Sequence, residues 1–153
     1  MPDRIVIADT SCLIALTNIE AIYILKELYQ EVFITEEIFN EFGEPVPEWI
    51  KIEKVRNEKY KKLLDQVLDS GEASAIALAL DFENVLLVLD DLKGRKEAEK
   101  LGFRITGTLG ILFKAKQLGI IKELTIYFEK LKNAGFRISE KIEKEILKRS
   151  IKK

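Results

Sequence analysis

The sequence contains no histidine and a single cysteine among its 153 residues. Without histidine, a Ser-His-Asp triad, a Cys-His dyad, an HExxH zinc site and a phosphohistidine relay are all excluded. One cysteine allows neither an intramolecular disulfide nor a thiolate cluster for zinc or iron–sulfur, which indicates a reducing compartment. Any chemistry must therefore come from carboxylates, hydroxyls, Lys, Arg or Tyr, and carboxylates favour hard metals such as Mg²⁺ or Mn²⁺.

Long apolar runs and nucleotide motifs are missing as well. No stretch approaches the ~20 apolar residues of a membrane helix, and the N-terminus lacks the pattern of a signal peptide. Neither GxGxxG nor GxxxxGK[ST] occurs, which argues against a nucleotide-binding protein. We therefore expect a cytoplasmic protein without a membrane partner.

The charged residues are distributed unevenly along the chain. Residues 1–113 hold 13 basic and 21 acidic side chains, whereas residues 114–153 hold 12 basic and 5 acidic ones. This asymmetry suits an acidic part that gathers metal and a basic helical C-terminal region, 122–153, that meets phosphate. A solvated helix face and tail would give the same pattern, and the sequence leaves both interpretations open.

Short apolar runs alternate with amphipathic segments. Strands are predicted at 5–8, 32–34, 85–89 and 103–105. Helices are predicted at 11–17, 21–29, 36–42, 57–69, 72–82, 92–101, 108–118, 122–133 and 139–149. Strands that are apolar on both faces and are separated by helices indicate an α/β fold, with a parallel sheet of about four to five strands flanked by helices on both faces. With 47% hydrophobic residues and no internal linker, residues 1–153 are predicted to form a single domain.

Acidic residues follow the strands where a parallel sheet places its ligand crevice. Asp9 comes after the first strand, and Asp90 and Asp91 come after the third. Glu41 and Glu72 lie on helices that would flank the same crevice. Converging carboxylates repel one another, and a divalent cation relieves this repulsion.

Several other side chains could assist such a site. Thr10, Ser11 and Thr108 offer hydroxyls for substrate or for metal-bound water, and Arg95 offers a phosphate contact. Four of the acids also have a simpler explanation, because acids are common as helix N-caps and in first turns: Asp9, Glu72, Asp90 and Asp91. Glu41 could be an ordinary exposed helix glutamate. Arg95, likewise, could be an ordinary surface or salt-bridged arginine.

The ordered set of motifs resembles a PIN domain, the nuclease fold of VapC-type toxins. The resemblance covers nearly the whole chain and rests on IVIADTS (5–11), VFITEEIFNEF (32–42), GEASAIALA (71–79), VLDD (88–91) with Arg95, and GTLGIL (107–112). The last three segments are most similar to a prokaryotic PIN-like subfamily.

The resemblance implies a metal-dependent endoribonuclease whose acids hold Mg²⁺ or Mn²⁺. By matching positions, the catalytic acids would be Asp9, Glu41, Glu72 and one of Asp90 and Asp91, and the metal would be held by Asp9, Glu72 and Asp90 or Asp91. The resemblance also implies RNA as substrate, a homodimer, and a role as the toxin of a type II toxin–antitoxin pair with a cognate antitoxin protein as partner.

Two other functions compete with this hypothesis. One is a catalytically silent PIN-like module that binds RNA or protein without cutting. The other is a phosphotransfer or phosphatase domain. It is disfavoured because a haloacid-dehalogenase site needs an acid two residues after its nucleophile, where Ser11 stands here.

Overall fold

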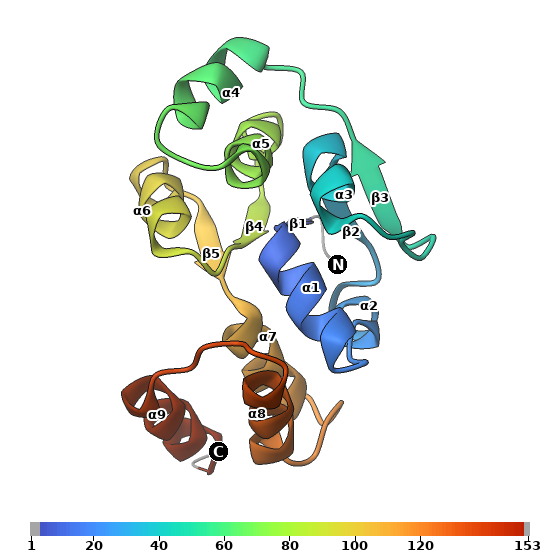
Figure 1. Ribbon diagram of the computed structural model, residues 1–153, viewed down its shortest axis with the longest axis vertical. Helices are drawn as coiled ribbons and strands as arrows, with labels where there is room; N and C mark the ends of the chain where they lie inside the picture. The colour runs from blue at the N-terminus through green and yellow to red at the C-terminus, as the bar shows by residue number, and fades with distance from the viewer. Residues whose placement is uncertain (1–3, 152–153) are drawn as a thin grey trace.

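Five parallel strands form the sheet at the centre of the protein, shown as a computed structural model that describes residues 4–151 (Figure 1). The strands are β1 (Ile5–Ala8), β2 (Val32–Thr35), β3 (Ile50–Glu53), β4 (Val85–Val88) and β5 (Arg104–Thr106), in the order β3-β2-β1-β4-β5. Consecutive residues of β1 and β4 are buried, so both faces of the sheet are covered at its centre, as the apolar strands predicted.

The helices are α1 (Thr10–Asn18), α2 (Tyr23–Tyr29), α3 (Glu36–Phe42), α4 (Glu58–Asp65), α5 (Ser70–Ala79), α6 (Leu92–Lys100), α7 (Thr108–Gln117), α8 (Leu124–Asn133) and α9 (Glu140–Ile151). Helices α1 to α6 lie between the strands in the chain, and α7 to α9 come after the last strand. No helix within residues 4–151 is both long and apolar enough to cross a membrane.

The central strands β1 and β4 fix the position of the first acids. They pair in register, with Ala8 opposite Val88, and both residues are fully buried. Because the two strands end level, the residues that follow them emerge at the same edge of the sheet. The backbone N–H of Asp9 continues this pairing by donating to the carbonyl of Val88 at 3.1 Å.

The predicted strands are confirmed to within one residue at each end, and β3 is the strand that the sequence did not reveal. Its sequence, Ile-Lys-Ile-Glu, carries two charges, and only Ile50 is buried. β3 is an edge strand, so one side of it is solvated and its sequence lacks the continuous apolar run of β1 or β4.

Helix α5 packs across β1, β2 and β4, and its residues 71–79 are all buried. It begins at Ser70, two residues before the predicted start, because Asp69 caps it. The predicted helix over 57–69 ends earlier, at Asp65.

Helices α7, α8 and α9 form a group below the sheet in Figure 1. Helix α8 packs against α1, α7 and α9, and α9 packs against α7 and α8. The basic region predicted at 122–153 falls on α8 and α9, with residues 152 and 153 outside the described part.

Candidate active site

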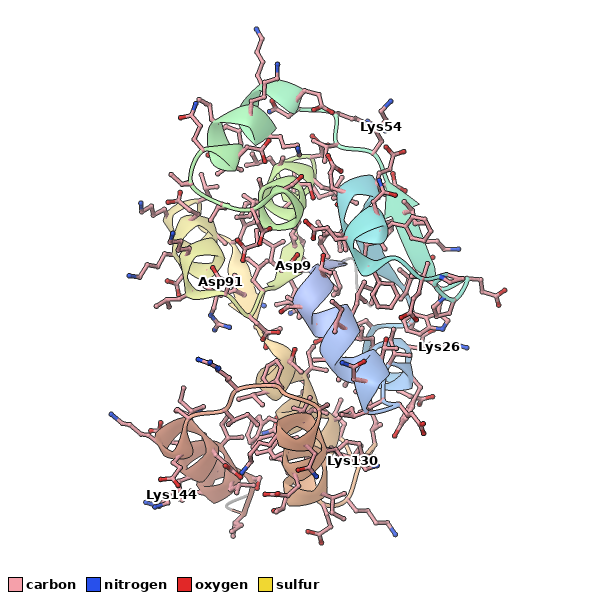
Figure 2. All side chains as sticks on the ribbon, in the orientation of Figure 1. Asp9, Lys26, Lys54, Asp91, Lys130 and Lys144 are labelled. Atoms are coloured by element: carbon pink, nitrogen blue, oxygen red, sulfur yellow. The ribbon has the colours of Figure 1, made fainter. Side chains whose placement is uncertain are left out.

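A cleft of about 1040 Å³ lies at the carboxyl edge of the sheet, between the strand ends and the C-terminal helices. Six acidic side chains line it: Asp9, Glu41, Asp69, Glu72, Asp90 and Asp91. The structure therefore brings all five acids predicted from the sequence into one cleft, together with a sixth. Figure 2 shows Asp9 at the start of α1 and Asp91 at the start of α6, both above the C-terminal helices.

Asp9 both caps α1 and faces the cleft. Its carboxylate accepts a hydrogen bond from the backbone N–H of Thr10 at 2.7 Å, and the residue is only 5% exposed. Burial is the main reason why the pKa of Asp9 is raised to about 7; nearby carboxylates raise it further, and the Thr10 hydrogen bond acts against them. Asp9 therefore caps α1 and is a candidate site residue at the same time.

Glu72 is the second buried acid. It is 4% exposed, and its carboxylate lies over Gly94 of α6, where an added Cβ would be 3.4 Å from the carboxyl carbon. Burial raises the pKa of Glu72 to about 8, and the charges of Asp69, Asp91 and Asp9 add to this effect. A backbone hydrogen bond from Asp69 works in the opposite direction.

Asp69 was missed in the sequence because it follows no strand. It is the N-cap of α5, and its carboxylate accepts from the backbone N–H of Glu72 at 2.8 Å. Asp69 also raises the pKa of Asp9. The signal that could have found it is an N-cap acid three residues before a glutamate, which is the spacing of a capping box.

Glu41 links three helix ends at the rim of the cleft. Its Oε1 accepts from the Thr10 hydroxyl at 2.6 Å, and its Oε2 accepts from the backbone N–H of Gly71 at 3.1 Å. A Cβ at position 71 would displace the Glu41 carboxylate, so Gly71 is what lets this carboxylate approach the backbone so closely.

Asp90 and Asp91 differ in environment. Asp90 is held firmly, because its Oδ1 accepts from the Thr108 backbone N–H at 2.8 Å and its Oδ2 accepts from the Thr108 hydroxyl at 2.7 Å and the Ser11 hydroxyl at 3.1 Å. Asp91 is exposed and caps α6 by accepting from the backbone N–H of Lys93 at 3.1 Å. Their surroundings therefore differ. Both nevertheless line the cleft, so both remain candidate site residues.

The three predicted hydroxyls all donate to carboxylates of the cleft. Thr10 and Ser11 line the cleft, so they remain within reach of a bound molecule. Thr108 is fully buried and does not line the cleft, which differs from the expected contact with substrate or metal-bound water. Its position is that of a residue that orients Asp90.

Two arginines also line the cleft. Arg95 donates from Nη1 to the carbonyl of Leu89 at 2.9 Å, which anchors its guanidinium beside Asp90. Arg137, on the segment between α8 and α9, was not predicted as a site residue because it follows no strand and lies in a generally basic region.

The donor set suits a divalent cation. The ion pairs found within residues 4–151 involve acids outside the cleft, so neither Asp9 nor Glu72 is neutralised by a side-chain cation there. Buried carboxylates with raised pKa values and no positive partner are stabilised by a bound cation. No three acidic side chains within this range are placed to enclose an ion. Mg²⁺ nevertheless needs only one or two carboxylates, with waters completing its shell.

Comparison with known families supplies an independent finding. A family model described as a PIN domain matches residues 5–152, which is nearly the whole chain. A comparison with curated proteins found no match.

Proposed function

Because the chain belongs to the PIN domain family, a family of nuclease-type domains that use divalent metal ions, we propose that it is an endoribonuclease dependent on Mg²⁺ or Mn²⁺. The observation that carries the proposal is the pair of buried acids, Asp9 and Glu72, whose pKa values are raised to about 7 and about 8 in one cleft. Keeping both carboxylates ionised in the cleft lowers the stability of the folded protein unless a cation neutralises them.

The residues of the cleft divide into ligands and supports. Asp9 and Glu72 would hold the metal, and Asp90 or Asp91 would contribute through the waters that complete its shell. When bound, the ion would activate a water and neutralise charge on a phosphoryl oxygen.

The supports keep the acids in place. Thr108 and Ser11 orient the carboxylate of Asp90, and Thr10 orients that of Glu41. Arg95, fixed by the Leu89 carbonyl, has donors left to receive a phosphate of the RNA strand.

The test is cleavage of a panel of single-stranded RNAs by purified protein with Mn²⁺, Mg²⁺ or EDTA. We expect metal-dependent cleavage that falls by roughly 100-fold or more in Asp9→Asn and in Glu72→Gln, since losing a ligand should weaken metal binding at least as much as losing a group that orients one. Asp81→Asn removes an exposed acid outside the cleft and is the matched control.

Failure of this test would favour the silent binding module. RNA binding by folded, metal-loaded protein without cleavage under any divalent ion would contradict the enzyme hypothesis. Cleavage that Asp9→Asn leaves unchanged would contradict the assignment of the site.

We also propose a biological role: the toxin of a type II toxin–antitoxin pair, acting as a homodimer on cytoplasmic RNA and silenced by an antitoxin protein. The order of VapC-type motifs supports this role. Induced expression should arrest bacterial growth, and the Asp9→Asn protein should not; light scattering of the purified protein should give twice the mass of one chain.

A further inference from the structure

The wall of the cleft that faces the acids is apolar. It comes from α9 and from the segment that leads into it, through Phe136, Ile138, Ile142 and Ile146. Ile142 is 48% exposed, and α9 has no fully buried residue. Phe136, Ile138 and Ile146 are half-buried and pack against the core, whereas Ile142 is left open to the cleft.

The cleft is also larger than a metal site requires. A divalent ion with six oxygen ligands occupies roughly 200 Å³, at about 30 Å³ for each water-sized ligand. The cleft measures about 1040 Å³ and is lined both by the acids and by these apolar side chains, so it has room for more than a metal ion and its ligands. A ligand that fills both parts needs an anionic group at the metal and an apolar body on the opposite side.

The polar residues on the wall are Arg137 and Ser139. Arg137 is exposed between Phe136 and Ile138, where it can reach a phosphate beside the wall. The hydroxyl of Ser139 accepts from the backbone N–H of Ile142 at 3.1 Å, so it is already engaged in starting α9.

We propose that this wall is a nucleobase subsite. It would hold one unstacked base of the RNA strand against Phe136, Ile138 and Ile142, while the phosphate next to that base lies at the acids. The inference rests on the proposed function and adds a specificity to it. Apolar side chains contact the faces of any base without reading its hydrogen-bonding edge, so affinity depends on having a base but little on which base it is. A base paired in a duplex cannot leave its stack to reach the wall without losing its pairing.

Two oligomers of equal charge distinguish binding of a base at the wall from binding that needs no base. One is fluorescein-labelled hexauridylate, and the other is the same ribose-phosphate hexamer without bases. Both are titrated by fluorescence anisotropy with Mg²⁺ into the full-length Asp9→Asn protein, which should not cleave them. Because both carry the same phosphates, the salt-dependent part of binding cancels in the ratio of the two dissociation constants.

The variants are Ile142→Ser and, as matched control, Ile126→Ser. Ile126 lies on α8, outside the cleft, and is 52% exposed, close to the 48% of Ile142. The parent should bind hexauridylate at least about fivefold more tightly than the abasic hexamer, in line with base stacking on aromatic and apolar surfaces. Ile142→Ser should lower this ratio at least about threefold, and Ile126→Ser should leave it unchanged. Phe136→Leu, which keeps an apolar side chain where Phe136 packs, should also lower the ratio of the two dissociation constants.

Equal affinity for the two oligomers, or equal ratios for Ile142→Ser and Ile126→Ser, would overturn the subsite. The same result is expected if the wall receives a protein segment instead of a base. Metal-dependent cleavage by the wild-type chain, together with equal affinity for the hexamers with and without bases, would leave the proposed function standing and remove only the subsite. Absence of both cleavage and RNA binding would remove both.

Discussion

At the scale of single residues, Asp9 and Glu72 make the stability of the metal-free protein depend on pH. Their pKa values in the folded protein are about 7 and about 8, against ordinary values of 3.8 and 4.5. A raised pKa favours the folded state while the group is protonated. This contribution is therefore complete below about pH 4 and is lost as the pH rises through 7 to 8.

We therefore expect the melting temperature of EDTA-treated protein to fall between pH 5 and pH 8, and Mn²⁺ or Mg²⁺ to restore it at pH 8. Asp9→Asn should stabilise the metal-free protein at pH 8 by up to about 4 kcal/mol, because three pKa units correspond to that amount, and should have little effect at pH 4. Asparagine also accepts the N-cap hydrogen bond from Thr10, so α1 keeps its start. Thermal unfolding, monitored by circular dichroism, gives the melting temperatures that test both expectations. A melting temperature that rises with pH in EDTA would contradict the assignment.

The site residues that the sequence predicts most directly are those whose place follows from a strand, whereas Glu41 and Glu72 were predicted from helices that would flank the crevice. Asp9, Asp90 and Asp91 leave buried strands, and parallel pairing alone brings them to one edge. Asp69 and Arg137 could not be found this way, because their positions depend on how α5 and the segment after α8 pack. The partners of Thr10, Ser11 and Thr108 were also out of reach, since hydrogen bonds between distant segments require the folded geometry.

At the scale of elements, a buried chain of hydrogen bonds joins α3 to α5. The hydroxyl of Thr35 accepts from the Ile38 backbone N–H at 3.0 Å and lies 2.6 Å from the Ser74 hydroxyl. Ser74 donates to the carbonyl of Gly71 at 2.8 Å, which leaves Thr35 as the donor to Ser74. Since α3 carries Glu41 and α5 carries Glu72, this chain sets the spacing of two acids of the cleft.

Thr35→Val should lower the free energy of unfolding by about 2 kcal/mol, because it removes an N-cap and leaves a buried hydroxyl without its partner. Thr35→Ser keeps both hydrogen bonds and is the matched control. Urea unfolding at pH 5, where Asp9 and Glu72 are largely protonated in the folded protein, isolates the effect. A loss no greater for valine than for serine would show that the hydroxyl chain does not stabilise the packing of α3 on α5.

How well an element could be predicted depended on what defines it. Strands β1 and β4 are apolar on both faces, so their composition identifies them. Strand β3 is an edge strand with charged residues, and its pairing with β2 is a tertiary property. The start of α5 was predicted two residues late because the apolar run begins after Asp69 has already capped the helix.

At the scale of the whole molecule, few of the basic side chains in the C-terminal part of the chain reach the acids of the cleft. Figure 2 shows Lys130 and Lys144 on α8 and α9, well below Asp9 and Asp91. Lys132 is paired with Glu129 at 3.3 Å and with Glu143 at 2.8 Å. Of the basic residues of 122–151, Arg137 alone lines the cleft, among the described residues. The charge asymmetry in the sequence therefore overstates how many cations face the acids.

This arrangement predicts which cations contribute to RNA binding. With Mg²⁺ present, the affinity of the Asp9→Asn protein for single-stranded RNA should fall with salt, by about 0.7 in the slope of log K against log[salt] for each phosphate that a cation contacts. Arg137→Ala removes a cation of the cleft and should reduce the slope by about that amount. Lys144→Ala removes the same charge from α9 outside the cleft and should leave the slope unchanged, because electrostatic interactions at the surface are largely screened beyond about 10 Å at 0.1 M salt. Anisotropy titrations from 50 to 300 mM KCl would give the three slopes. An equal reduction in both variants would mean that the RNA lies across the outer face of α9 instead of in the cleft, and the path assigned to the substrate would then be wrong.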